Sequence, residues 1–346
     1  MNNKKRGTKS PLNLFKKCNT GSITRANIRN ILIDYIKFHV LSPPINSLLK
    51  NKLLDFNTIV NSASGEIKKH TAGYKGLKFT IYEQSPTHPK GLLIVSGSLH
   101  KYHNNGKHNY NRFTKKDFIN VINDLVRKFN LHPEKCIIKS IEIGVNIQPP
   151  VPTIEILENL IMHRKKPFKS IYTKDEGDYI QTKKQRSIIK VYDKKRHYQN
   201  FGLTDEIMRF ELKYLKMIEL QKQGIYNLQD LINFDFNIFK HKLLKTWNEI
   251  LFYEPEIWHN TPYQYKYSNS LFWEQLKPDN FKYHSKKLSR LKTNPNALQY
   301  QIYEIMKKQI DELINTEKSY PVMKKRHTQN TQINKQVSKK VYSPPL

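Results

Sequence analysis

The stretch Lys139-Ser-Ile-Glu-Ile-Gly-Val-Asn146 alternates apolar and polar side chains, as a β-strand with one buried face does. Two further stretches, Ile188-Ile-Lys-Val-Tyr-Asp-Lys194 and Ile207-Met-Arg-Phe-Glu-Leu-Lys213, repeat the pattern. In all three, polar and charged residues share the face opposite the apolar one: Glu142, Asn146, Lys190, Tyr192, Lys194, Arg209, Glu211 and Lys213. If the strands are neighbours in one sheet, these groups converge on one surface.

Outward from these stretches, the pattern predicts more strands before them and helices after them. Further strands are expected over 31–40, 77–82 and 92–96, with weaker ones within 168–182. Helices are expected over 114–129 with Thr114 as N-cap, over 153–163 with Thr153 as N-cap, and over 227–233, 236–252 and 297–315. Residues 42–75 are predicted to be irregular and 97–111 to be a polar loop. The fold class is therefore α+β: a largely antiparallel β-sheet core with flanking helices, followed by a helical C-terminal portion.

The chain divides into four predicted regions. Residues 1–30 and 321–346 are basic and poor in apolar periodicity, which is typical of flexible tails. Residues 31–235 form the predicted α+β core that carries catalysis and DNA binding. Residues 236–320 form the predicted helical C-terminal region.

The charge balance points to a polyanion as partner. The 346 residues include 60 Lys plus Arg and 29 Asp plus Glu, a formal net charge of +31. Such a surplus repels itself unless a polyanion is bound, and nucleic acid is the first candidate, ahead of a membrane surface. We see no apolar run long enough for a membrane span or a signal peptide. The two cysteines, Cys18 and Cys136, have no metal-ligand spacing and fit a reducing compartment, so we expect a cytoplasmic protein without a membrane partner.

The residue types on the polar face suit chemistry on a phosphodiester. Glu142, Glu211 and Asn146 offer oxygen ligands for Mg²⁺ or Mn²⁺. Arg209 could add a planar, bidentate contact to a phosphate. Tyr192 is the candidate nucleophile, although its hydroxyl, with an ordinary pKa near ~10, needs help at neutral pH.

Two lysines on the same face could give that help. Lys190 and Lys194 could lower the pKa of Tyr192 and hold its phenolate; alternatively they only attract DNA. Other known kinds of site are missing. No two of the 13 histidines are separated by a single residue, and no Gly-x-x-x-x-Gly-Lys-Ser/Thr loop exists. A paired-histidine metal site and an ATP-driven motor are therefore not expected.

On three stretches, the chain resembles rolling-circle replication initiators, namely the gene II/X family of filamentous phage and the plasmid initiators of the replication-transfer class. The stretches are Ile141-Glu-Ile-Gly-Val-Asn-Ile147, Ile189-Lys-Val-Tyr-Asp-Lys-Lys195 and Met208-Arg-Phe-Glu-Leu-Lys213. In that class, a strand with acidic metal ligands precedes a Tyr-x-Lys strand and then an Arg-x-Glu strand. The segments 97–104 and 107–111 also look like the phage-type subgroup.

The resemblance implies an enzyme that nicks one strand of origin DNA. Tyr192 would become linked to the 5′-phosphate, and the freed 3′-hydroxyl would prime rolling-circle synthesis. Glu142 and Glu211 would hold the metal, Arg209 the phosphate, and Lys194 would assist the tyrosine. Further DNA contacts are assigned to Lys190, Lys195 and Lys213.

One position departs from the plasmid relatives, which tend to carry a second acid where this chain has Asn146. Implied partners are single-stranded or hairpin origin DNA and the host replication helicase and polymerase, with a homodimer as one possible assembly. Tyr198 is a weaker candidate for a second nucleophile. Three alternatives stay open: a non-catalytic DNA-binding protein (a repressor or decayed initiator), a conjugative relaxase, and an RNA- or ribosome-binding protein.

Overall fold

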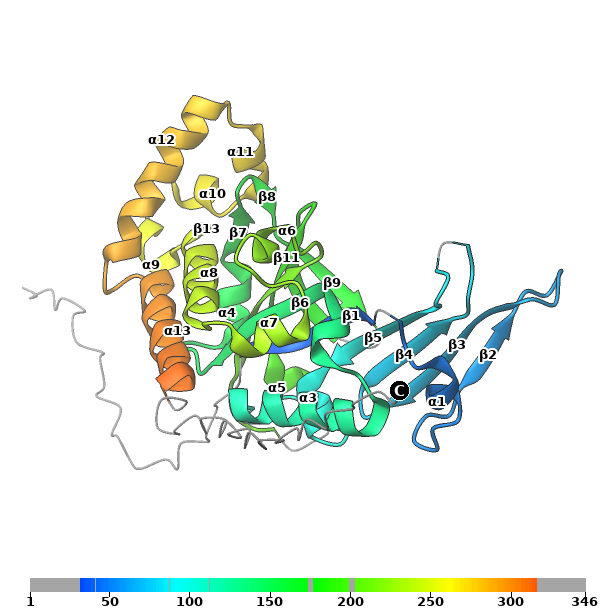
Figure 1. The fold of residues 1–346 in the computed structure, drawn as a ribbon. Helices are drawn as coiled ribbons and strands as arrows, with labels where there is room; N and C mark the ends of the chain where they lie inside the picture. Colours follow the sequence, from blue (N-terminus) through cyan, green and yellow to red (C-terminus); the bar gives the residue numbers. More distant parts are fainter. Residues whose placement is uncertain are drawn as a thin grey trace, which may run out of the picture.

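A computed structural model describes residues 32–315 except 41, 87, 112, 174–176 and 199–202. The predicted tails, 1–30 and 321–346, lie outside the described residues. The described part is built on one ten-stranded sheet in which all neighbouring strands are antiparallel (Figure 1). The predicted α+β class with an antiparallel sheet, flanking helices and a helical C-terminal portion is confirmed.

The strands do not follow chain order across the sheet. In space they run β2 (Asn57–Val60), β3 (Ile67–Tyr74), β4 (Leu77–Tyr82), β5 (Leu92–Ser98), β1 (Ile33–Val40), β6 (Cys136–Ile147), β12 (Met208–Tyr214), β11 (Ser187–Asp193), β10 (Gly177–Lys183) and β9 (Lys169–Thr173). A second sheet contains β13 (Ile250–Phe252), β7 (Leu160–His163) and β8 (Lys166–Pro167). The three strands that carry the polar groups are adjacent in the order β6, β12, β11, so the condition for their polar groups to converge is met.

Most of the helices are short. They are α1 (Ile45–Leu49), α2 (Leu99–His103), α3 (Lys115–Phe129), α4 (Thr153–Glu158), α5 (Lys194–His197), α6 (Ile218–Gln221), α7 (Leu228–Asn233), α8 (Asn237–Asn248), α9 (Pro255–Trp258), α10 (Gln264–Tyr267), α11 (Ser270–Gln275), α12 (Pro278–Ser289) and α13 (Leu298–Asn315). Thr114 caps α3 as predicted: its hydroxyl accepts a hydrogen bond from the backbone of Asp117, whose side chain reciprocates.

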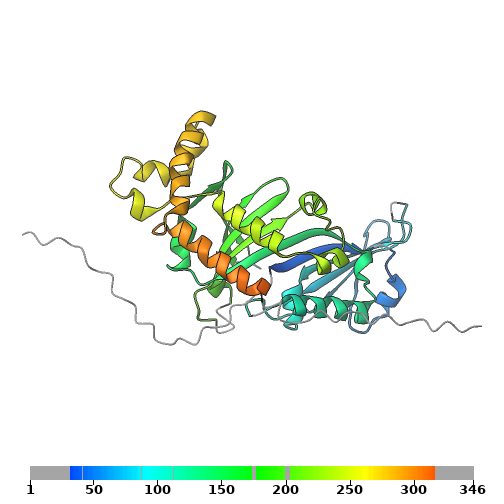
Figure 2. The ribbon, with the colours of Figure 1, turned by 60° about the vertical axis from the view of Figure 1, so that its left-hand side comes forward.

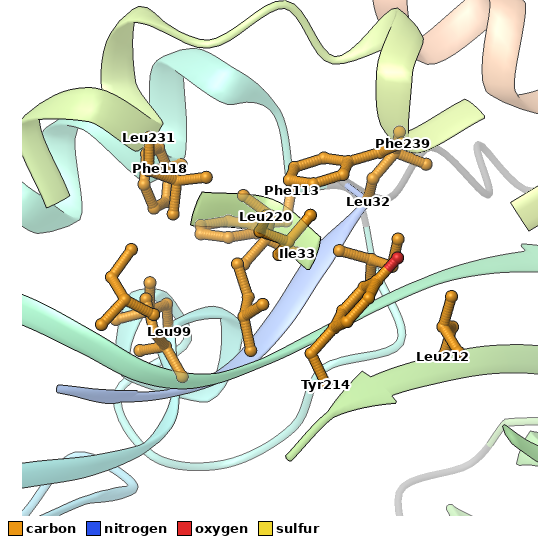
Figure 3. Close-up of a cluster of buried hydrophobic side chains, with 14 of the residues drawn as sticks. Leu32, Ile33, Leu99, Phe113, Phe118, Leu212, Tyr214, Leu220, Leu231 and Phe239 are labelled. Carbon is orange, nitrogen blue, oxygen red and sulfur yellow. The ribbon is translucent and has the colours of Figure 1, made fainter. Parts of the chain in front are cut away.

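The main hydrophobic core lies between the sheet and helices α3, α7, α8 and α13 (Figure 2). Figure 3 shows part of it, including Phe118 of α3, Leu231 of α7 and Ile33 of β1. On β12, the Phe210 ring lies 5.5 Å from the Trp247 ring of α8. Because side chains alternate along a strand, the covering helices leave Arg209 and Glu211 on the opposite face. That opposite face carries the site.

Several local predictions are wrong. The helix from Thr153 ends at Glu158, and 160–163 form strand β7, paired with β13. A short apolar run is compatible with a strand or a helix. Here the pairing of residues 160–163 with β13 makes them a strand. Thr153 does not cap α4, because Pro152 occupies the N-cap and no side chain bonds there. Likewise, residues 250–252 of the predicted helix 236–252 form β13.

Two segments predicted to be irregular contain regular structure. Residues 42–75 include α1, β2 and β3, and residues 97–111 include α2. The predicted boundary at residue 235 stays a prediction; α8 and α13 contribute Trp247 and Ile310 to the main core. In the part of the chain that the structure describes, no helix is long and apolar enough to cross a membrane.

Candidate metal and phosphodiester site

Three buried carboxylates meet on the polar face of the sheet. Asp34 of β1, Glu142 of β6 and Glu211 of β12 each present an oxygen, and these oxygens lie within 4.8 Å of one another. All three residues are buried. Oxygen donors gathered at this spacing suit a hard divalent cation such as Mg²⁺ or Mn²⁺.

Asp34 was missed by the sequence analysis because β1 does not alternate strictly. A strict alternation would put Asp34 on the face of Ile36, in the core. The register between β1 and β6 shifts between Ile33 and Ile36, which marks an irregularity of the β-bulge type. As a result Asp34 and Tyr35 both line the polar cavity, while Ile36 is fully buried in the core.

Arg209 contacts two of the three acidic residues, Glu211 and Asp34. Its Nε donates a hydrogen bond to Glu211 Oε1 at 2.7 Å, and its Nη1 donates to Asn146 Oδ1 at 3.0 Å. Its Nη2 lies 3.7 Å from Asp34 Oδ2. Only 1% of Arg209 is exposed, so water screens its charge less than it would at the surface. The oxygen of Asn146, predicted as a metal ligand, is thus engaged with the guanidinium.

Tyr192 sits on β11 directly opposite Arg209 in the register. Its hydroxyl donates a hydrogen bond to Glu211 Oε1 at 3.0 Å. Its ring stacks on the His197 ring with the centroids 4.6 Å apart, which fixes its orientation. Burial and the negative charge of Glu211 raise the pKa of Tyr192 well above its ordinary value.

Burial also perturbs the carboxylates themselves. Desolvation and repulsion from Glu211 raise the pKa of Glu142 to about 8. Burial pushes the pKa of Glu211 upward too, but the Arg209 charge outweighs it and holds that pKa below its ordinary value. Opposite shifts in neighbouring carboxylates are typical of functional sites.

Asn109 connects the loop after α2 to the site. Its side-chain amide donates to Asp34, and its Oδ1 accepts the Tyr198 hydroxyl at 2.6 Å. Its backbone carbonyl accepts Lys194 Nζ at 2.8 Å. Lys194, predicted to assist Tyr192, is therefore held by this carbonyl, and burial, followed by the Arg209 charge, lowers its pKa to about 7.

The other three predicted lysines each have a different neighbour. Lys213 Nζ is 3.6 Å from Glu142 Oε2 and 4.0 Å from the centroid of the Tyr35 ring. Lys190 lies over the Tyr179 ring at 4.9 Å. Lys195 is further out and 3.8 Å from Glu206.

These groups surround a cavity of about 470 Å³, which we define by Asp34, Glu142, Glu211, Tyr192 and Lys190 and call the catalytic cavity after the role proposed for it below. Its wall also includes the following groups from loops and neighbouring strands: Tyr35, Gly76, Ser98, Lys101, Lys107, Asn109, Tyr179, His197 and Tyr198. Pockets of ~300–1,000 Å³ hold small ligands, and one nucleotide unit is of that size class. Carboxylates at its floor and lysines at its rim suit a metal-assisted reaction on a phosphate.

Comparisons with known proteins add little. No family model matches the chain, and no curated protein sequence matches it. Among solved structures, the chain is similar to a rolling circle replication initiator protein from Geobacillus stearothermophilus, at 11% identity. The likeness covers 53% of this chain and 72% of the other, with a TM-score of 0.28. A TM-score this low supports no conclusion on fold or function.

Proposed function

We propose that this protein is a replication initiator that nicks one DNA strand at an origin, with Tyr192 as nucleophile and a divalent cation as cofactor. The tyrosine oxygen would bond to the scissile phosphorus while the bond from phosphorus to the 3′-oxygen breaks. The 5′-phosphate would remain on Tyr192, and the 3′-oxygen, once protonated, would be the primer for rolling-circle replication. The reverse reaction would reseal the strand.

The residues present fit a divalent cation. Asp34, Glu142 and Glu211 would hold it, and the raised pKa of Glu142 reflects burial first and then repulsion from Glu211, which a bound cation would relieve. When bound, the cation would neutralise charge on the scissile phosphate. Arg209 contacts both Glu211 and Asp34 and is itself held by Asn146, so we assign Arg209 to positioning the ligands as well as to charge balance.

The chain itself supplies a route for the proton of the nucleophile. Tyr192 already donates to Glu211 Oε1, so this carboxylate can accept the proton as the tyrosine attacks. Lys190 lines the same cavity and adds positive charge where the phosphate would enter. We keep Lys195 and Lys213 as DNA contacts, with Lys213 also balancing the charge of Glu142.

The observation that carries the proposal is a tyrosine hydroxyl bonded to one carboxylate of a buried three-acid cluster, at the floor of an open cavity in a strongly basic chain. A structural tyrosine does not need three buried acids beside it, because burying carboxylates is costly.

The test is strand nicking. The purified chain is incubated with Mn²⁺ and supercoiled plasmid carrying its own gene and flanks, then treated with protease and run on a gel. We expect open circles that disappear with EDTA and with Tyr192→Phe. Tyr172→Phe, which alters a tyrosine that is 73% exposed, is the matched control and should nick normally. Equal nicking by Tyr192→Phe would refute the role of Tyr192.

A non-catalytic DNA-binding protein is the second candidate. The raised pKa of Tyr192 favours it, because a neutral phenol is a poor nucleophile. Under this reading the protein binds DNA and never nicks it, and Tyr192→Phe leaves every activity unchanged.

A further inference from the structure

A second hollow lies beside the catalytic cavity, along α3. Its volume is also about 470 Å³, and Lys75, His103, Asn120, Asn123 and Arg127 line it; we call it the α3 groove. Asn120, Asn123 and Arg127 are all exposed and recur at helical spacing, so they form one polar stripe.

The two hollows share a wall. Gly76 and Lys101 line the catalytic cavity, while the residues next to them in sequence, Lys75 and Tyr102, line the α3 groove. The wall is built where the turn between β3 and β4 packs against α2 and the residues after it. Here the two segments pack closely: a Cβ placed on Gly76 would lie 2.9 Å from the Lys101 Cβ and 3.9 Å from the Gly106 Cα.

Both glycines have left-handed backbone, with φ of 83° and 86°, so side chains are disfavoured at both positions. These two glycines, with the Lys101 side chain packed beside Gly76, lie between the hollows, and we call this crest the Gly76–Gly106 saddle. Lysines flank it on both sides: Lys101 and Lys107 line the catalytic cavity, and Lys75 lines the groove. Asp124 also lines the groove, paired with Arg127, so the lysines on either side of the crest supply the positive charge that a phosphate backbone passing between the hollows requires.

We propose that the single DNA strand held at Tyr192 continues over the Gly76–Gly106 saddle into the α3 groove. The inference rests on the proposed function and extends it to the nucleotides that flank the scissile phosphate. Asn120 and Asn123 would hydrogen-bond base edges, and Arg127, whose side chain is 78% exposed beside Asp124, would contact a phosphate. A duplex, with its persistence length of ~150 bp, is too stiff to follow the saddle, whereas a single strand bends freely.

Length-dependent binding tests the proposal without needing cleavage. The full-length Tyr192→Phe protein and the same protein with N120A, N123A and R127A added are titrated with fluorescein-labelled d(T)6 and d(T)16. The parent should bind d(T)16 more tightly than d(T)6. The added substitutions should weaken d(T)16 binding by about tenfold or more, since two neutral hydrogen bonds and one charged contact are lost, and leave d(T)6 binding within twofold.

A matched control removes the same chemistry elsewhere. N280A, N296A and R290A also delete two asparagines and one arginine, all exposed, in the C-terminal region. This control should bind both oligonucleotides as the parent does, and circular dichroism melting shows whether each variant is folded.

Three results would overturn the inference: parental affinity for d(T)16 in the groove variant, an equal loss at both lengths, or an equal loss for a 16-bp duplex. The first would show that the groove takes no DNA, the second that it does not continue the cavity, and the third that it does not select single strands. Nicking by the protein with Tyr192 intact separates the two claims. If nicking is absent but the length-dependent loss is present, only the proposed function fails.

Discussion

At the scale of single residues, Arg209 and Asp34 decide whether the polar face can hold a cation. Arg209 reaches Glu211, Asn146 and Asp34 with three different nitrogens, so the carboxylates are oriented before any ligand arrives. Preorganised ligands bind a cation more tightly than mobile ones, because no side-chain ordering is left to offset the binding free energy.

Asp34→Asn should lower the affinity for Mn²⁺ by about 10–100-fold or more, since it removes one of three charged ligands while keeping the side-chain shape. Isothermal titration calorimetry on the full chain measures this affinity. Asp55→Asn, at an exposed position, is the control and should bind as the wild type does. Unchanged affinity in Asp34→Asn would remove Asp34 from the site.

The raised pKa of Glu142, about 8, predicts that cation binding depends on pH. Only the carboxylate binds a cation, so below pH 8 binding must first displace a proton. Mn²⁺ affinity should therefore rise by up to about tenfold per pH unit from pH 6 to pH 8 and level off above, as expected for one released proton. Calorimetric titrations in two buffers of different ionisation enthalpy would count the protons released when Mn²⁺ binds. A Mn²⁺ affinity that does not change with pH would contradict the assignment of Glu142 as a ligand.

At the scale of elements, two local features of the strands shape the site. The irregularity in β1 turns Asp34 onto the polar face, and Gly144 lets β6 lie close to the side chains of β12. A Cβ on Gly144 would lie 2.7 Å from the Phe210 carbonyl oxygen and 2.9 Å from Glu211 Cγ. The Phe210 oxygen cannot move without disturbing the pairing of β12 with β6, and Glu211 Cγ cannot move without displacing the Glu211 carboxylate.

Gly144→Ala should therefore lower the free energy of unfolding by about 1–3 kcal/mol and weaken Mn²⁺ binding, as overpacking does. Urea denaturation measures the first effect and calorimetry the second. Gly73→Ala in β3 is the control, because a Cβ there meets nothing within 4 Å. Equal behaviour of the two variants would show that the space at Gly144 has no role.

At the scale of the whole molecule, the net charge of +31 predicts binding to a polyanion. Binding to a 30-bp duplex should fall by roughly 10³–10⁵ between 50 and 200 mM salt if 6–10 phosphates are contacted. Fluorescence anisotropy of the full chain over this salt range measures the slope. A salt-independent affinity would contradict an electrostatic role for the lysine surplus.

The strict alternation of β6, β11 and β12 made much of the fold and part of the site predictable. Period-two patterns place Glu142, Tyr192 and Glu211 on one face, and the structure brings these three residues together. Asp34 was not predictable, because an irregular strand breaks the period on which the inference relies. Asn109 was missed because its contacts to Asp34 and Lys194 span 75 and 85 residues, and no local pattern signals them.

The short strands β7 and β13 were unpredictable for a different reason. The three apolar residues of each strand fit the end of a helix as well as a strand, and only the pairing of the two strands decides between these structures. The aromatic segment that follows forms α9 to α12 around its own small core, which contains Tyr267 and Trp273.

The most direct test of the central claim is to map the covalent link between protein and DNA. The full chain is reacted with plasmid carrying its own gene and flanks in Mn²⁺, digested with nuclease and trypsin, and analysed by mass spectrometry. We predict a 5′-nucleotide attached to Tyr192, and no such adduct on Tyr198, whose hydroxyl is bound by Asn109. Nicked DNA with the adduct on any other residue, or with none, would contradict the account.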